Sequence, residues 1–487
     1  MVRARKIAGL VLAAGLAAGG LTAGAAGAAG ASSSSCGGSG SVTTVNGTLA
    51  DGATYLLECP AGAWNGTLYL YSHGYVSPGS TSNPAQDVGD PVTRAWMLGH
   101  GYALAGSSYA STGWAIAQAL PDQINTLNAF GSLYGQPRTT VAWGHSLGGI
   151  ITAGLLQDYP KRFDAALPMC GVLSGGVATW NTALDAEFAF QKLIDPAVQI
   201  VNITNPAANL QGAEVAGTQA QATPQGRARL ALVSALGDTP GWFTPLSPEP
   251  AATDYATQEA NQFEWGSQVT FPFVFAFRAE LEARAGGNPS WNTGVNYLTD
   301  LAKSADLKEV VALYRAAGLS LTKDLLTLNS APRVKASPNA EAYLLKNIAF
   351  NGRISVPVLT MHTTGDGLVV PENEQAYRSA VDQAGRASLL RQVFVHRAGH
   401  CAFTPAETVT AVQTLENRLA TRWHVPSPAA MNAQAAALGP QFNIFSANGA
   451  VVATAPAFIR YSPAAYLRPF NLIPRFGQTQ VPFLGAQ

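Results

Sequence analysis

The sequence predicts a protein of the α/β class, with a mostly parallel central sheet and helices on both of its faces. Two observations lead to this prediction. Short apolar runs typical of buried strands alternate with stretches whose apolar residues recur at helical spacing. The alternation lapses after about residue 176 and resumes near residue 352. Because strands joined by helices usually run parallel, this order favours a parallel sheet that is buried on both faces.

The first 31 residues are typical of a secretory signal peptide. Cations at Arg3, Arg5 and Lys6 precede an apolar region over residues 7–21, and the Ala-Gly-Ala sequence at 29–31 offers a cleavage site. The alternative is a transmembrane anchor, but the apolar region is short and diluted with Gly and Ala. We therefore expect a secreted protein without a stable membrane anchor. The remaining 26 cationic and 29 anionic side chains give a net charge of −3, which does not indicate a nucleic acid partner.

Four cysteines follow the signal peptide: Cys36, Cys59, Cys170 and Cys401. An even number in an exported chain indicates two disulfides, for which three pairings are possible. A bond from Cys36 to Cys59 would fasten the N-terminal segment, and one from Cys170 to Cys401 would join two distant loops. None of the spacings is typical of a zinc site.

The chain of 487 residues is long for one compact core, so we expect a sheet domain with a large insertion. We assign residues 32–175 and 352–424 to the sheet domain. Strands are expected at 47–49, 54–58, 67–72, 102–107, 140–143, 163–169, 356–361 and 392–395, and helices at 121–130, 149–157, 374–383 and 407–422. The Pro- and Ala-rich segment over 425–487, with a strand-like run at 450–454, is expected to pack on this core.

The insertion over residues 176–351 is predicted to be mainly helical. Its position in the chain would place it over the carboxyl ends of the strands as a cap, although a separate domain is the alternative. One stretch of the insertion is dense in aromatic residues. These side chains are either ordinary core or the lining of an apolar pocket: Phe263, Trp265, Phe271, Phe273, Phe275 and Phe277.

The motif that carries most chemical information is Gly144-His145-Ser146-Leu147-Gly148. It lies between an expected strand and an expected helix, which is the context of a G-x-S-x-G nucleophile elbow. The turn is so tight that a side chain at Gly144 or Gly148 would clash with the neighbouring strand and helix. The helix N-terminus directs N–H groups toward a developing oxyanion. Ser146 is therefore the candidate nucleophile.

A serine nucleophile needs a general base and an acid that orients the base, and in this architecture they follow in the order acid, histidine. Asp366 directly follows the strand over 356–361, at its carboxyl end, where a helix cap is the alternative role. Glu372 and Glu374 are the competing acids, but they fall inside the next helix.

His400 is the candidate base, because it follows the last expected strand of the core and precedes a helix. His396, four residues earlier, is the runner-up. The other five histidines lie next to the nucleophile, before it, before the acid or after the last helix: His145, His73, His100, His362 and His424.

Two backbone N–H groups are expected to form an oxyanion hole. One belongs to Leu147, directly after the nucleophile. The other belongs to Tyr75, because Gly74 allows the chain after the strand over 67–72 to turn back toward Ser146. The alternative for Gly74 is an ordinary turn glycine.

These motifs together resemble the α/β-hydrolase superfamily. The matching elements are His73-Gly74-Tyr75, the elbow through Gly149, Gly365-Asp366 with a following Val-Pro, and Gly399-His400. They cover about residues 45–175 and 352–423. The resemblance implies an α/β-hydrolase fold with a serine triad, which needs neither a metal nor an organic cofactor.

Feruloyl esterases and tannases are similar to this chain in one further element, a Cys directly after the catalytic His, as in His400-Cys401. In that group the partner Cys directly precedes the nucleophile, where this chain has His145. The resemblance therefore implies that Cys170, at the end of the strand after the elbow, would bridge to Cys401 and anchor the His400 loop.

The predicted function is hydrolysis of a small carboxylic ester, apolar or aromatic, through an acyl-enzyme on Ser146. A secreted exopeptidase is the alternative, and it would need an anionic site for an amino terminus. Candidate pairs for that site are Asp185 with Glu187 and Glu259 with Glu264.

A third class is a binding protein without activity, but such a protein would usually have lost one of the three triad residues. Dehalogenase and epoxide hydrolase chemistry needs a carboxylate where Ser146 stands.

Overall fold

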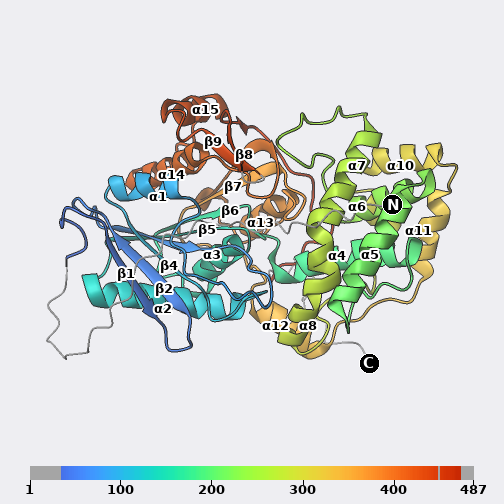
Figure 1. Cartoon of the computed structure of the whole chain (residues 1–487), viewed down its shortest axis with the longest axis horizontal. Helices are drawn as coiled ribbons and strands as arrows, with labels where there is room; N and C mark the ends of the chain where they lie inside the picture. Colours follow the sequence, from blue (N-terminus) through green and yellow to red (C-terminus); the bar gives the residue numbers. More distant parts are fainter. Residues whose placement is uncertain (1–34, 448–449, 473–487) are drawn as a thin grey trace, which may run out of the picture.

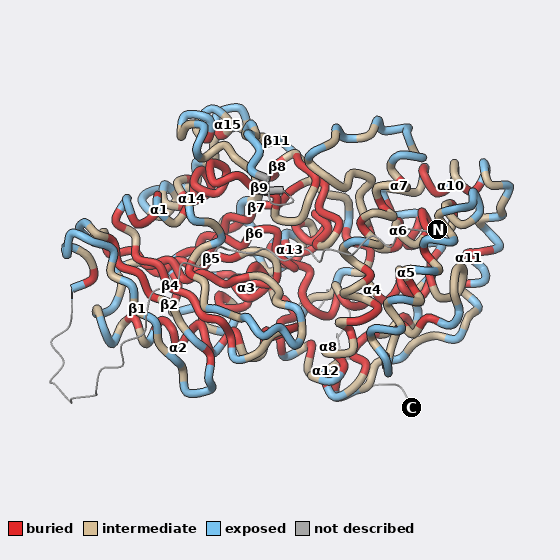
Figure 2. Tube along the Cα trace, viewed as in Figure 1, coloured by how far each residue is buried: buried red, intermediate tan, exposed pale blue. Residues whose placement is uncertain are grey.

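The protein is described by a computed structural model over residues 35–447 and 450–472. The expected signal peptide over 1–31 lies outside the described residues. A sheet with its flanking helices occupies one side of the molecule, and a bundle of helices occupies the other (Figure 1). Buried residues follow the strands of the sheet and the inner faces of both sets of helices (Figure 2).

The central sheet has nine strands in the order β1-β2-β4-β3-β5-β6-β7-β8-β11. The strands are β1 (Thr43–Thr48), β2 (Thr54–Cys59), β3 (Thr67–Ser72), β4 (Ala103–Ser107), β5 (Thr139–His145), β6 (Ala165–Met169), β7 (Val358–Gly365), β8 (Leu390–Ala398) and β11 (Phe458–Ile459). All neighbours from β4 to β8 pair in parallel, whereas the pairs β1–β2, β2–β4 and β8–β11 are antiparallel. The predicted α/β class with a mostly parallel sheet is confirmed.

Alternating side chains of the strands pack on helices of opposite faces. In β3, Leu68 and Leu70 belong to one hydrophobic core and Tyr69 and Tyr71 to the other. The first core includes residues of α2 (Ile116–Tyr134), α3 (Leu147–Asp158) and α13 (Glu372–Gln383). The second includes residues of α1 (Pro91–Gly99), α14 (Pro405–Ala420) and α15 (Pro428–Ala437). The parallel strands at the centre of the sheet are therefore covered by one layer of helices on each face.

The chain between β6 and β7 forms only helices. They are α4 (Gly175–Leu193), α5 (Pro206–Gln221), α6 (Pro224–Leu236), α7 (Tyr255–Trp265), α8 (Arg278–Ala285), α9 (Tyr297–Leu301), α10 (Leu307–Ala316), α11 (Leu321–Ser330) and α12 (Pro338–Lys346), with π-helical segments η1 (Gly266–Thr270) and η2 (Phe273–Phe277) between α7 and α8. This helical insertion, called the cap below for its expected position, has a hydrophobic core of its own, built around residues of α4, α6 and α10.

The C-terminal segment contacts both parts of the molecule. The segment includes a short hairpin of β9 (Ile444–Ala447) and β10 (Ala450–Ala453). After this hairpin, β11 pairs with β8 at the edge of the sheet. Strand β8 itself is preceded by the short helix η3 (Ala387–Leu389). Further along, Arg468 binds the carboxylate of Asp185 in the cap at 2.8 Å. In the described part of the chain, no helix is long and apolar enough to span a membrane.

Candidate active site

Ser146 lies in the turn between β5 and α3, with backbone angles φ 59° and ψ −123°. This left-handed conformation is unusual for a residue with a side chain. Two glycines make the turn possible. A Cβ at Gly148 would lie 1.8 Å from the carbonyl oxygen of Ser72 in β3, and one at Gly144 would lie 2.4 Å from the same oxygen. The elbow therefore needs glycine at both positions because the β3 backbone passes directly beside it.

Ser146, His400 and Asp366 form a continuous hydrogen-bonded chain. The Nε2 atom of His400 lies 2.7 Å from Ser146 Oγ, and its Nδ1 atom lies 2.7 Å from Asp366 Oδ2. The other carboxylate oxygen of Asp366 accepts the backbone N–H groups of Leu368 and Val369, both at 3.0 Å. Burial raises the pKa of Asp366, but His400 and His362 outweigh burial and lower it to about 2. Asp366 is therefore an anion that holds the His400 ring toward the serine.

A disulfide joins the loops that carry these residues. Cys170, directly after β6, is bonded to Cys401, directly after His400, and the second disulfide joins Cys36 to Cys59. Both Cys170 and Cys401 have positive φ angles, 42° and 53°. The loop that presents His400 is thus covalently attached to the strand next to the elbow.

The segment His73-Gly74-Tyr75 passes beside the nucleophile. A Cβ at Gly74 would lie 3.4 Å from the Cβ of Ser146. In the described part of the chain, the N–H groups of Tyr75 and Leu147 donate to no other group. Both donors are therefore free to bind an oxygen of a substrate near Ser146.

Aromatic residues of the cap reach this site from η2 and α7. The ring of Tyr75 lies 5.0 Å from that of Phe273 and 6.0 Å from that of Phe277. Trp265 packs against Gly367, the residue after Asp366. The rest of the aromatic stretch packs in the core of the cap: Phe263, Phe271 and Phe275. The stretch therefore divides between core residues and residues that face the catalytic loops.

Two neighbouring histidines are engaged elsewhere. The runner-up base His396 is partly exposed and pairs with Glu249 at 3.3 Å. His145 is bonded to the hydroxyl of Tyr71 at 3.0 Å, and burial, with a contribution from His400, lowers its pKa to about 4. Neither of these rings contacts Ser146 among the described interactions.

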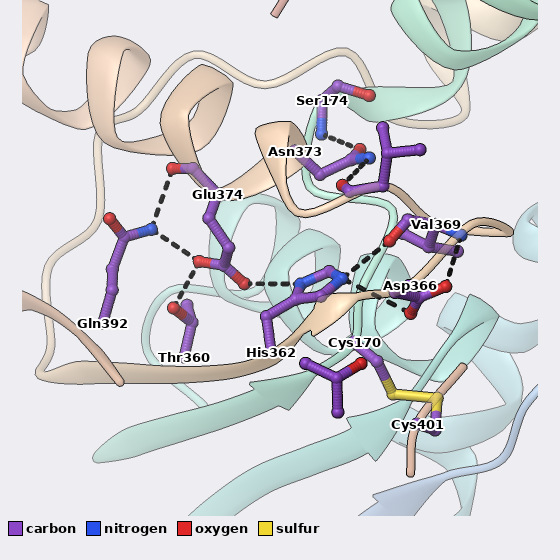
Figure 3. A network of polar contacts seen from close by, with 12 residues as sticks. Cys170, Ser174, Thr360, His362, Asp366, Val369, Asn373, Glu374, Gln392 and Cys401 are labelled. Carbon is purple, nitrogen blue, oxygen red and sulfur yellow. Dashed lines mark hydrogen bonds and ion pairs between the residues drawn. A yellow bond between two sulfur atoms is a disulfide. The ribbon is translucent and has the colours of Figure 1, made fainter. Parts of the chain in front are cut away.

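His362 and Glu374 are functional candidates that the sequence analysis considered and set aside. His362 is fully buried in β7, and its ring lies between Asp366 and Glu374 (Figure 3). The available signal was the spacing of His362, inside β7, and Asp366, directly after this strand. Sequence reasoning set Glu374 aside because it falls inside a helix, and it does lie in α13, but its carboxylate points into the protein.

The acidic pairs proposed for an amino terminus are bound to residues of the cap and of the C-terminal segment. Asp185 accepts hydrogen bonds from Tyr297 and Arg468. Glu187 lies 3.7 Å from the buried guanidinium of Arg278. The second pair is bound to glutamines, Glu259 to Gln221 at 3.1 Å and Glu264 to Gln268.

Comparison with known proteins identifies the family. The model of the Tannase-like family of unknown function (DUF6351) matches residues 48–340, more than half of the chain. The chain belongs to this family. The chain is also 30% identical over 425 residues to an o-phthalyl amidase of Xanthobacter agilis, a match that covers 80% of this chain and 90% of that relative.

Solved structures similar to this chain include two esterases. Feruloyl esterase B from Aspergillus oryzae has 15% identity and a TM-score of 0.34, and the match covers 75% of this chain and 74% of that chain. The rice cell wall degrading esterase LipA from Xanthomonas oryzae has 14% identity and a TM-score of 0.34, with 78% and 87% covered. The elbow on a mostly parallel sheet and the family confirm an α/β-hydrolase, and the protein is a hydrolase of the esterase or amidase type.

Proposed function

We propose that the protein is a secreted serine hydrolase that cleaves carboxylic esters through an acyl-enzyme on Ser146. The hydrogen-bonded chain from Ser146 through His400 to Asp366 carries this proposal, because both of its bonds measure 2.7 Å. The two disulfides support secretion, since such bonds persist in oxidising compartments.

In this mechanism Ser146 Oγ attacks the ester carbonyl carbon while His400 Nε2 accepts the hydroxyl proton. The carbonyl oxygen becomes an oxyanion, which the N–H groups of Leu147 and Tyr75 stabilise. His400 then gives its proton to the leaving alkoxide, and an alcohol departs. A water molecule, deprotonated by His400, attacks the acyl-enzyme, and the free acid leaves as Ser146 recovers its proton.

The rings of Tyr75, Phe273 and Phe277 favour an aromatic or apolar acyl group of modest size. An amide of an aromatic acid is the second candidate substrate, favoured by the similarity to an o-phthalyl amidase. The same acyl-enzyme would form, and His400 would protonate a leaving amine instead. The exopeptidase is less favoured, because Arg468 pairs with Asp185 and the buried Arg278 lies beside Glu187.

The decisive experiment compares wild type, Ser146→Ala and His396→Ala on paired substrates that share one acyl group. Benzoate and phthalate would each be offered as a p-nitrophenyl ester and as a p-nitroanilide. We expect ester hydrolysis by wild type and a loss of at least about 10³-fold in Ser146→Ala. His396→Ala should keep its activity, because this partly exposed side chain pairs with Glu249 and not with the triad.

Faster turnover of anilides than of esters would select the amidase candidate. An absence of turnover together with an absence of Ser146 labelling by a fluorophosphonate would contradict a serine hydrolase of either kind.

A further inference from the structure

The carboxylate of Asp366 faces a second imidazole besides that of His400. His362 Nε2 lies 3.5 Å from Asp366 Oδ2, the same oxygen that accepts the hydrogen bond of His400. The same Nε2 atom lies 2.7 Å from the carbonyl oxygen of Val369. On the other side of the ring, Nδ1 lies 3.1 Å from Glu374 Oε1 (Figure 3). His362, Asp366 and Glu374 are all fully buried.

The partners of this ring determine its protonation. A carbonyl oxygen only accepts hydrogen bonds, so Nε2 must carry a proton that it donates to Val369. The second oxygen of Glu374 accepts from the hydroxyl of Thr360 and from Gln392 Nε2, so Oε1 is the oxygen that faces Nδ1. When Nδ1 also donates, to Oε1, the ring carries two N–H groups and is an imidazolium. Burial lowers the pKa of His362, but the bonds to Asp366 and Glu374 outweigh burial and raise it to about 10.

We propose that His362 is a positioning residue, held as a cation by Glu374, that shares the Asp366 carboxylate with His400 and thereby sets the pH at which His400 becomes a base. This proposal rests on the proposed function of Ser146, His400 and Asp366. Like charges near one another disfavour protonation, so a cation at His362 makes His400 lose its proton at lower pH. Without that cation, two buried carboxylates would favour the protonated, inactive form of His400.

Other ionisable groups around this cluster also act on it electrostatically. Glu372, at the start of α13, faces His362, and burial raises its pKa to about 7. Asp306 in the cap acts on Glu372, Tyr377 lies near Glu374, and His145 lies near His400. These groups stay in place in every variant below, so a difference between variants reports on His362 itself.

The test is the rate at which a fluorophosphonate labels Ser146, measured from pH 5 to 9 on the full chain. Labelling needs only the nucleophile and its base, so the unknown substrate does not matter. In His362→Gln we expect the midpoint of the rise with pH to move up by about one unit, as loss of a nearby charge predicts. Labelling at low pH should slow by up to about tenfold and recover at pH 9.

Thr360→Val is the matched control. It removes a buried hydrogen bond to Glu374 but keeps the charges of His362 and Glu374, so its midpoint should match wild type. An unmoved midpoint in His362→Gln, with rates lowered equally at every pH, would show a merely structural role and overturn the proposal. No labelling of wild type at all would instead overturn the proposed function.

A second measurement keeps the test valid if His362→Gln does not fold. Nitrogen NMR of wild type labelled at its seven histidines should show one ring that stays doubly protonated at pH 8.5. No doubly protonated ring at that pH would overturn the proposal.

Discussion

At the scale of single residues, backbone strain is concentrated at the nucleophile. Ser146 has φ 59°, which costs on the order of 1–3 kcal/mol for a residue with a side chain. The surrounding contacts hold it there, since the backbone N–H of Ser146 donates to the carbonyl of Met169 and Gly148 packs on β3. In this backbone conformation, Oγ of Ser146 points toward Nε2 of His400.

Replacing Gly148 by alanine should damage both the fold and the reaction. The added Cβ would lie 1.8 Å from the backbone oxygen of Ser72, so the elbow must shift, and we expect a loss of about 3 kcal/mol in the free energy of unfolding. Urea unfolding and Ser146 labelling measure the two effects. Gly212→Ala in α5 is the control, because its Cβ would meet nothing within 4 Å, and it should stabilise by about 0.5–1 kcal/mol. Equal stability of the two variants would contradict this account.

Some residues of the site could be found from the sequence, and others could not. The glycine pattern locates Ser146, and the chain order of strands points to Asp366 and His400, which the structure brings together within hydrogen-bond distance. Their catalytic roles stay a prediction. The pairing of His362 with Glu374 depends on the rotation of α13 against β7, which a single sequence does not specify.

At the scale of elements, the loop after β8 is the most constrained connection of the site. The bond between Cys170 and Cys401 attaches it to the end of β6, and Arg397 binds the buried carboxylate of Glu407 on α14. His400 is therefore held from both sides of its own loop.

Removing the Cys170–Cys401 bond should reduce activity before it unfolds the protein. The double variant Cys170→Ser, Cys401→Ser frees the His400 loop, and chain entropy predicts a destabilisation of about 5 kcal/mol for so long a loop. The control is Cys36→Ser, Cys59→Ser, for which the shorter loop predicts about 3 kcal/mol. Both pairs would be assayed below their melting temperatures. Comparable Ser146 labelling rates in the two variants would show that the His400 loop does not need its disulfide.

The bounds of single elements were predicted unevenly, since the strand expected at 392–395 extends over Leu390–Ala398 while the helix expected at 149–157 is only slightly longer, over Leu147–Asp158. The apolar run over 67–72 coincides with β3, because a strand buried on both faces is apolar throughout. The helix expected at 121–130 extends over Ile116–Tyr134, and Pro121, which usually breaks a helix, lies inside it. Helix α1 was not predicted, although Asp90 caps it and Pro91 begins it.

At the scale of the whole molecule, the cap contains buried acids without matching cations. Burial, helped by Asp306, raises the pKa of Glu309 in α10 to about 8. Burial also raises the pKa of Glu259 in α7 to about 7. These carboxyls keep their protons in the folded protein at pH values where the unfolded chain has lost them. Their contribution to stability is therefore complete below about pH 4.5 and is lost as the pH rises toward 8.

Glu309→Gln should remove part of this pH dependence. We expect the variant to gain at least about 1 kcal/mol over wild type at pH 8 and to match it at pH 5, because glutamine cannot ionise. Thermal unfolding at the two pH values measures the difference. Asp382→Asn, at an exposed position on α13, should show no such gain. A gain at pH 5 equal to that at pH 8 would contradict the role of ionisation.

The arrangement of the cap and the C-terminal segment was the least predictable part. Composition indicates helices over 176–351, but the contact of η2 with Tyr75 needs the three-dimensional fold. The expected packing of the C-terminal segment on the core did not include the bond from Arg468 to Asp185 in the cap, nor the pairing of β11 with β8. Both involve partners far apart in sequence, which local patterns do not encode.

The short pairing of β11 with β8 affects the solubility of the protein. β8 is a long strand, and the backbone N–H of His396 donates to Ala457 beside β11. A chain truncated after α14 would leave this edge bare, with unpaired N–H and C=O groups ready to pair with another copy. Such a fragment would keep Ser146, Asp366 and His400, yet we expect it to self-associate. The segment that carries β11 would thus help to keep the protein in solution.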